Sequence, residues 1–372
     1  MTPHDEVLSA LLDTPGLRLE IRLLGRVADP LIGNASDREV FLFVPDLHVV
    51  TAERARAYGQ YGFNHAEQRV LARLLQRLAR LREDWRQAGT HQLLTTQVGD
   101  FFDLWRQFVA EADPNTIADD AHGDLRDVLY RGVDRGLPCL EATILLGNHD
   151  TKRGVALAEI PFQLKAFNPT APEGNPFLFT THGDAFDLLE RLVPDAIEEF
   201  LVHFAGPRTP VNKYPIANWG KAAADINKPL DQLNDCIVKP RHDLSAMTGA
   251  VRVVPGQALP ARSAHVITSP GQTDHGRFDK YYESLSKAAE RGFYGGSVRV
   301  VVVGHSHEAT LILCEPPGGG RPLVMMDTGA WIEQCTYPLA EGGTARPEPS
   351  AQIGVIHGND VRLYQIRVLP GA

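Results

Sequence analysis

Apolar runs separated by polar junctions divide the first half of the chain into alternating strands and helices. Predicted strands cover residues 17–25, 39–44, 92–98, 142–146 and 177–181. Residues 17–25 alternate apolar and polar side chains, which is typical of a half-exposed strand. Residues 39–44 (EVFLFV) are continuously apolar, which favours a strand buried on both faces.

Helical periodicity lies between these strands. A helix is predicted from Asn64 onward, because leucines recur on one face with Arg and Glu on the other, and Glu67 suits a capping box with Asn64. Further helical sequence occurs near residues 101–112, 124–135, 188–204 and 279–291.

Short strands with turn signals dominate the last quarter of the chain. They are predicted at residues 297–303, 309–314, 323–327, 352–357 and 361–368. Alternating strands and helices followed by strands alone fit two sheets packed face to face with helices outside.

Five of the predicted strands end in a cluster of polar residues. The clusters are Asp46-Leu47-His48, Gly99-Asp100-Phe101-Phe102-Asp103, Gly147-Asn148-His149-Asp150, His182-Gly183-Asp184 and Gly304-His305-Ser306-His307. In open α/β sheets the ligand site lies outside the carboxyl ends of the strands. We therefore expect these strand ends to form one site.

The residue types in the clusters indicate bound metal ions. Carboxylate, imidazole and amide groups suit Mn²⁺, Fe or Zn²⁺, and no cluster contains a cysteine. Asp46 and His48 are two residues apart, so on a strand they face one side and can share one ion. His305 and His307 have the same spacing. Asp100, in a tight turn after Gly99, is expected to offer both carboxylate oxygens and to bridge two ions.

In this order, the motifs DxH, GDxxD, GNHD, HG and GHxH resemble those of the calcineurin-like metallophosphoesterases. One such motif is a weak signal, whereas all five in order are highly specific. The resemblance implies an α/β (α+β) fold, a four-layer αββα β-sandwich in a single domain over residues 1–372. A mostly helical or irregular, lid-like insert is expected at residues 190–292.

The same resemblance implies a dinuclear centre of two divalent cations, Mn²⁺ in the first place and Fe or Zn²⁺ as alternatives. One ion would be held by Asp46, His48, Asp100 and His307. The second would be held by Asp100, Asn148, His182 and His305.

The resemblance also implies two catalytic residues. His149 matches a histidine that faces the substrate as leaving-group acid or phosphate donor, and Asp103 matches the carboxylate that orients it. We expect an Asp103–His149 pair, and substrate contacts from Asn148 and His149. Asp150 is expected to cap the turn after the histidine. The implied reaction is attack by a metal-bridging hydroxide on a phosphomonoester, a phosphodiester or a nucleotide pyrophosphate.

Two other functions stay open. The stretches 99–105 (GDFFDLW) and 181–187 (THGDAFD) look most like UDP-diacylglucosamine pyrophosphohydrolases, which act on a lipid substrate at the membrane surface. A non-catalytic scaffold is the other alternative, although scaffolds of this type lose ligands that are all present here. Leu104 stands where protein Ser/Thr phosphatases usually carry arginine, which argues against that class.

The expected insert carries a local excess of positive charge. Residues 206–262 hold eight Lys or Arg and four Asp, in a chain whose net charge is -9. This segment is either a solvated surface extension or a lid whose cations hold an anionic substrate. In the second case Tyr214 and Trp219 could stack a base or a sugar.

Composition adds a few exclusions. The chain has 372 residues, of which 43% are hydrophobic, and its acidic balance gives no strong nucleic-acid footprint. No apolar run is long enough for a transmembrane segment, and the first residues do not form a signal peptide. We expect a cytoplasmic protein that takes a small phosphorylated or nucleotide substrate; the pattern does not predict an oligomeric state.

Overall fold

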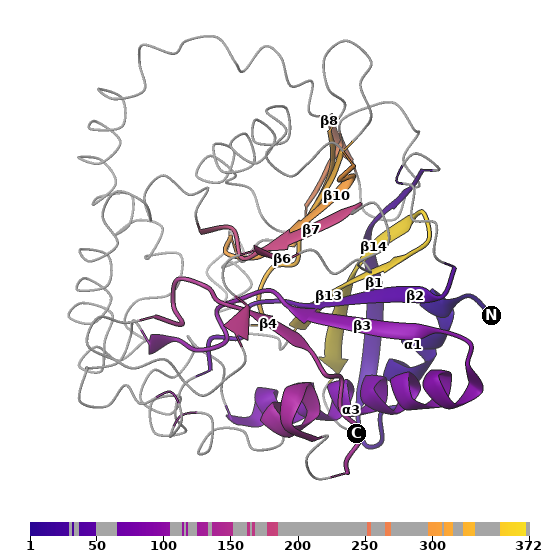
Figure 1. Ribbon diagram of the computed structural model, residues 1–372, viewed down its shortest axis with the longest axis vertical. Coiled ribbons are helices and arrows are strands. Elements are labelled where there is room, and N and C mark those ends of the chain that lie inside the picture. The colour runs from indigo at the N-terminus through magenta and orange to yellow at the C-terminus, as the bar shows by residue number, and fades with distance from the viewer. Residues whose placement is uncertain are drawn as a thin grey trace, which may run out of the picture.

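In its described residues the computed structural model contains two mixed sheets and few helices (Figure 1). It describes residues 1–29, 32, 37–49, 65–104, 114, 117, 125–132, 136–151, 162–163, 166–167, 177–184, 251–253, 265–268, 297–306, 309–314, 323–331 and 350–369.

The first sheet has seven strands in the order β1-β14-β13-β2-β3-β4-β5. Strands β2, β3, β4 and β5 are mutually parallel, and β13, β14 and β1 extend the sheet in antiparallel fashion. The strands are β1 (Arg18–Ala28), β2 (Glu39–Val44), β3 (Gln92–Gln97), β4 (Thr143–Leu145), β5 (Phe162–Gln163), β13 (Ser350–His357) and β14 (Asp360–Leu369).

The second sheet also has seven strands, in the order β6-β7-β10-β12-β11-β9-β8. Its central strands β7, β10 and β12 are parallel. The strands are β6 (Ala166–Phe167), β7 (Leu178–Thr181), β8 (Val251–Val253), β9 (His265–Thr268), β10 (Val300–Val303), β11 (Thr310–Cys314) and β12 (Leu323–Asp327).

Strand β2 shows how its sequence serves two cores. Val40, Leu42 and Val44 belong to a buried cluster that contains the helices α1 (Pro3–Leu12) and α3 (His65–Ala88). Phe41 and Phe43 belong to a second cluster, which they share with β7, β10, β11 and β12 of the other sheet. Because successive side chains of a strand point to opposite faces, an all-apolar β2 packs on both sides.

Helix α1 begins with a capping box. The Thr2 hydroxyl accepts a hydrogen bond from the Asp5 N–H at 3.3 Å, while the Asp5 carboxylate accepts from the Thr2 N–H at 3.0 Å. Val7 and Leu11, four residues apart, are buried on one helix face. The sequence analysis did not predict this helix.

The predicted mixed α/β class is confirmed. The predicted strands occur with shifts of at most a few residues, as does the long helix. Residues 101–104 follow β3 as loop rather than helix, and a helical stretch at 125–132 includes a π-helical turn at Asp127–Arg131. Within the expected insert at 190–292, the structure describes only β8 and β9, both strands. The helical layer expected on the outer face of the second sheet falls outside the described residues.

Helix α3 is the longest described helix, and it carries charged residues along its length. In the described ranges no helix combines enough length with enough apolar character to cross a lipid bilayer.

Candidate metal centre

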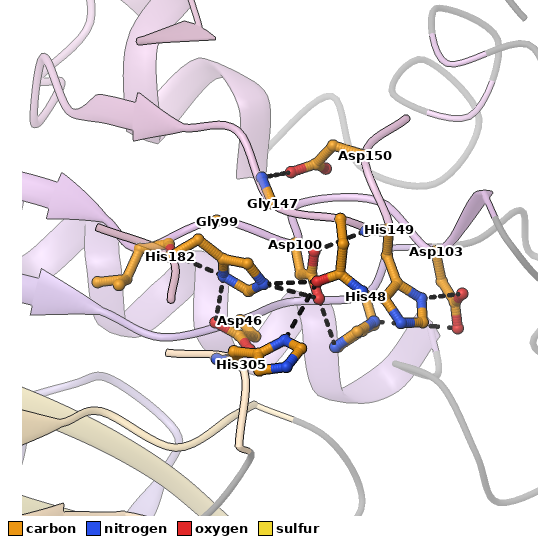
Figure 2. A network of polar contacts seen from close by, with 12 residues as sticks. Asp46, His48, Gly99, Asp100, Asp103, Gly147, His149, Asp150, His182 and His305 are labelled. Atoms are coloured by element: carbon orange, nitrogen blue, oxygen red, sulfur yellow. Dashed lines mark hydrogen bonds and ion pairs between the residues drawn. The ribbon is translucent and has the colours of Figure 1, made fainter. Parts of the chain in front are cut away.

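The polar clusters meet where the parallel strands of the two sheets end (Figure 2). The loops after β2 and β3 are joined by the Leu47 and His48 N–H groups, which donate to the Asp100 carbonyl at 3.0 and 2.9 Å. The loops after β7 and β10 are joined by the Gly304 N–H, which donates to the His182 carbonyl at 2.9 Å.

Asp46 connects the two sheets at this point. Its carbonyl accepts a hydrogen bond from the Trp331 N–H at 2.7 Å, just beyond β12. Its carboxylate oxygen Oδ2 accepts from the His305 N–H at 2.8 Å, in the loop after β10. Side chains from both sheets are thereby held around a common centre.

Asp100 lies at the middle of the centre, and its side chain is 1% exposed. Oδ1 accepts a hydrogen bond from the His149 N–H at 2.9 Å. Oδ2 lies 3.3 Å from His182 Nε2 and 3.7 Å from His48 Nε2. One oxygen therefore faces an imidazole on each side. Oδ1 accepts a single backbone hydrogen bond and keeps a second lone pair, so the expectation that both carboxylate oxygens are offered to metal ions stays a prediction.

His182, Asn148 and His305 converge beside this oxygen. Asn148 Oδ1 lies 2.9 Å from His182 Nε2 and 3.2 Å from His305 Nδ1. His182 Nδ1 lies 3.0 Å from the Val98 carbonyl, which only accepts, so this nitrogen carries the proton. In neutral His182 the lone pair is then on Nε2, directed toward the Asn148 and Asp100 oxygens.

The separations between these atoms fit a metal ion. Nε2 of His182, Oδ1 of Asn148 and Oδ2 of Asp100 carry lone pairs and lie 2.9 to 3.3 Å apart where their separations are measured. At metal–ligand distances of about 2.1 Å, adjacent ligands of an octahedron are about 3.0 Å apart. A proton on His182 Nε2 or a bound cation would stabilise lone pairs that converge in this way.

On the His48 side of Asp100, His48 Nε2 approaches Oδ2. Asp46, expected on this side, instead groups with Asp100 and His182, and His48 groups with Asp103 and His149; in each group the ligand atoms lie within 4.8 Å of one another. His307, the fourth expected ligand on this side, lies outside the described residues. Tyr214 and Trp219 of the expected insert also lie outside the described residues, and the structure brings together the remaining site residues named from the sequence.

The predicted contact between Asp103 and His149 is present. His149 Nδ1 lies 2.9 Å from Asp103 Oδ1, and Asp103 is fully buried while the His149 side chain is 14% exposed. The second Asp103 oxygen lies 4.0 Å from His48 Nδ1. The rings of His48 and His149 pack edge to face, with their centroids 4.9 Å apart. A single carboxylate thus faces both imidazoles.

Three candidate ligands have a left-handed backbone. His48, Asp100 and His305 have φ values of 48°, 47° and 72°, and Glu141 is the one other such non-glycine among the described residues. This conformation costs about 1–2 kcal/mol per residue and persists only where surrounding contacts determine it. Its concentration at these positions is typical of a functional site.

Buried charges strongly perturb one another here. Burial raises the pKa of Asp46 well above its usual range, and Asp100 and Asp327 raise it further. Burial alone would also raise the pKa of Asp100, but His182, His149 and His48 together lower it well below the usual range. Burial disfavours protonated His182, yet Asp100 and Asp46 raise its pKa well above 6.5. These shifts favour protonated Asp46 and protonated His182 beside ionised Asp100, so protons offset the negative charge of the carboxylates where no cation is bound.

Buried polar side chains that the sequence analysis missed connect the loops. Gln97 Nε2 donates to the Pro45 and Gly99 carbonyls at 3.1 and 2.6 Å. Asp327 accepts from the Ser306 hydroxyl at 2.6 Å. Both residues lie at the ends of apolar strands, as the expected metal ligands do. This shared position is the sequence signal from which they could have been predicted.

Asp150 also connects two loops, rather than capping only its own turn. Its two oxygens accept from the Phe102 N–H at 2.7 Å and from the Gly147 N–H at 2.8 Å. Burial and the charge of Asp100 raise the pKa of Asp150 to about 8. The loops after β3 and β4 are held together by this carboxyl group.

In comparisons with known proteins, no family model and no curated protein matched this chain. A function for the centre therefore has to follow from its chemistry and from the order of its motifs.

Proposed function

We propose that the chain is a dinuclear metal-dependent phosphohydrolase with the four-layer sandwich of the calcineurin-like metallophosphoesterases. One observation carries the proposal: a single buried oxygen, Asp100 Oδ2, lies between His182 Nε2 at 3.3 Å and His48 Nε2 at 3.7 Å. A carboxylate oxygen with an imidazole nitrogen on each side suits two neighbouring cations.

The donor set defines the cofactors. Asp100, Asn148, His182 and His305 would hold one ion, and Asp46, His48, Asp100 and His307 the other. Carboxylate, amide and imidazole ligands without thiolate favour Mn²⁺, with Fe or Zn²⁺ as alternatives. When bound, two such ions supply positive charge for phosphate oxygens and an activated water for in-line attack on phosphorus.

His149 is the proposed proton donor to the leaving group. Asp103 Oδ1 accepts the hydrogen of His149 Nδ1 at 2.9 Å, which leaves Nε2 to exchange a proton with the substrate. Its 14% exposure contrasts with the 1% or less of His48 and His182, so His149 is the more accessible imidazole. A general acid is needed most when the leaving group is a poor one.

The proposed substrates are small phosphomonoesters, phosphodiesters or nucleotide pyrophosphates. The chemistry of the centre is common to all three classes, because each presents phosphate oxygens to cations and a leaving oxygen to His149. Asn148 and His149 are adjacent in one loop, and we propose that both contact the phosphate group.

Asp100→Asn tests this function. The purified chain with added Mn²⁺ would be assayed against p-nitrophenyl phosphate, bis-p-nitrophenyl phosphate and UDP-sugars, with bound Mn²⁺ measured by elemental analysis. We expect hydrolysis of at least one substrate and two ions per chain. Because the variant loses the central negative charge, its activity should fall more than about 10³-fold and its metal content should drop.

Asp360→Asn is the matched control, since Asp360 pairs with Arg26 and Arg362 away from the metal loops. It should keep the metal content and activity of the wild type. Full activity in Asp100→Asn, or a wild-type chain that binds no Mn²⁺, would refute the proposal.

A further inference from the structure

Ser306 stands between two expected ligands, and its own side chain is turned to Asp327. The Ser306 hydroxyl donates to Asp327 Oδ2 at 2.6 Å, and both residues are buried. The other oxygen, Asp327 Oδ1, accepts from the Gly329 N–H at 3.0 Å. Asp327 is the last residue of β12 and lies opposite Val303, the last residue of β10. This carboxylate therefore ties the loop after β10 to the end of the neighbouring strand.

The loop held in this way contains a strained residue. His305 has φ 72°, and its N–H donates to Asp46 Oδ2 at 2.8 Å. The Ser306 N–H donates to the Gly304 carbonyl at 2.9 Å. Left-handed backbone in a non-glycine residue persists only where surrounding contacts determine it. For His305 those contacts include the Asp46 carboxylate on its own N–H and the Asp327 carboxylate on the next side chain.

This backbone decides where the imidazole lies. With its main chain so fixed, His305 places Nδ1 3.2 Å from Asn148 Oδ1, which in turn lies 2.9 Å from His182 Nε2. If the contact between Ser306 and Asp327 were lost, His305 could relax toward an ordinary φ, and its ring would turn away from Asn148. The loop could then no longer present His305 to the ion expected beside His182.

We infer that Ser306 and Asp327 are positioning residues for His305, so that the affinity of the ion held by Asn148, His182 and His305 depends on a hydrogen bond that touches no metal. The inference rests on the proposed dinuclear centre. Partners that orient a metal ligand change metal affinity by about 10- to 100-fold when they are removed.

Thr328 offers a matched control beside Asp327. Its hydroxyl is also buried and donates to the Val303 carbonyl at 3.2 Å, so it joins the same two strand ends. It does not hold a residue next to His305. Removing either hydroxyl deletes one buried hydrogen bond, but only the loss at Ser306 should change how a metal ion is bound.

The test is a titration of metal-free protein with Mn²⁺ by isothermal calorimetry, together with thermal unfolding of the metal-free forms. Ser306→Ala and Asp327→Asn should weaken one of the two Mn²⁺ sites by about 10- to 100-fold. Ser306→Thr, which keeps a hydroxyl, should return the affinity to within about threefold of the wild type. Thr328→Val should keep both affinities even if its melting temperature falls.

Unchanged Mn²⁺ affinities in Ser306→Ala beside normal wild-type binding would overturn the inference and leave the proposed function intact. An equal loss in Thr328→Val would overturn it as well, because the effect would then be general loosening of the strand ends. A wild-type chain without Mn²⁺ sites would refute the proposed function, and this inference with it.

Discussion

Two groups of histidines lie at opposite ends of β2 and β3, each with one imidazole buried to 1% exposure or less, and they differ in the charges around that imidazole. At the carboxyl ends, His182 is fully buried beside two carboxylates. At the amino ends, His4 is 1% exposed, and its ring neighbours include His357, which pairs with Val40 at the start of β2. His91 precedes β3 and contacts the His357 ring. We call His4, His91 and His357 the His4 cluster.

Equal burial has opposite consequences in the two groups. For His182, burial lowers the pKa, but Asp100 and Asp46 outweigh it and raise the value well above 6.5. For His4, burial lowers the pKa, Arg362 lowers it further, and Asp360 offsets only part of this, so the value is about 4. Neighbouring charge therefore decides whether a buried imidazole is protonated or stays neutral. A concentration of histidines alone does not indicate a metal site.

The hydrogen bonds show the same difference. Each ring nitrogen of His182 has a polar partner, Val98 on one side and Asn148 on the other. Within the described part of the chain, neither ring nitrogen of His4 makes a hydrogen bond of normal geometry. The His4 ring stabilises the fold by packing. Protonating it would bring a second positive charge close to the Arg362 guanidinium.

The largest expected effect comes from the histidine proposed as the proton donor to the leaving group. His149→Ala should keep both metal ions and slow turnover by roughly 10²–10⁴-fold for substrates with poor leaving groups. For p-nitrophenyl esters, whose leaving group needs little protonation, the loss should be smaller. Steady-state kinetics and elemental analysis check both statements; a fall in metal content would show that His149 belongs with the ligands.

An intermediate effect is expected in the His4 cluster. The pKa of His4 in the folded chain is about 4, below the ordinary 6.5. Between pH 4 and pH 6.5 the His4 imidazole therefore binds a proton in the unfolded chain but not in the folded one. The free energy of unfolding should therefore fall as pH drops from 6.5 to 4, by about 3 kcal/mol from His4. His4→Phe should remove this part of the pH dependence.

Urea unfolding of the wild type and of His4→Phe, each at pH 8 and at pH 4.5, measures this pH dependence of the free energy of unfolding. Groups of the metal centre titrate in both proteins, so their contribution cancels in the difference. An identical loss of stability in both proteins would show that His4 is protonated without cost, and the contrast with His182 would fail.

The smallest expected effect concerns the helix that carries His4. Thr2→Ala removes the hydroxyl that accepts the Asp5 N–H, and losing such a cap costs about 1 kcal/mol. Looser packing of α1 should also move the His4 pKa upward, toward 6.5, which an NMR titration of the imidazole resonances would follow. An unchanged pKa would show that packing alone keeps α1, and His4 with it, in place.

The sequence predicted best what strong periodicity or exact motifs specify. Apolar runs such as EVFLFV and LVMMD became β2 and β12 with the predicted bounds, because a strand buried on both faces has few alternatives. The motif residues converged because parallel strands bring their carboxyl ends together.

Other features depend on partners that one local segment does not reveal. Strands β8 and β9 have three and four residues and pair with each other, and β9 pairs with β11, so they form through tertiary context. The hydrogen bond at Asp100 Oδ1 depends on the His149 N–H, which comes from a loop distant in the sequence. The roles of Gln97 and Asp327 likewise require knowing which loops are neighbours.

The central claim is that Asp100 Oδ2 lies between two cations. Anomalous diffraction from crystals grown with Mn²⁺ tests it most directly. The account predicts two peaks roughly 3.5–4 Å apart, one beside His182 and Asn148 and one beside His48, with Asp100 between them. A single peak, or peaks away from Asp100, would contradict it.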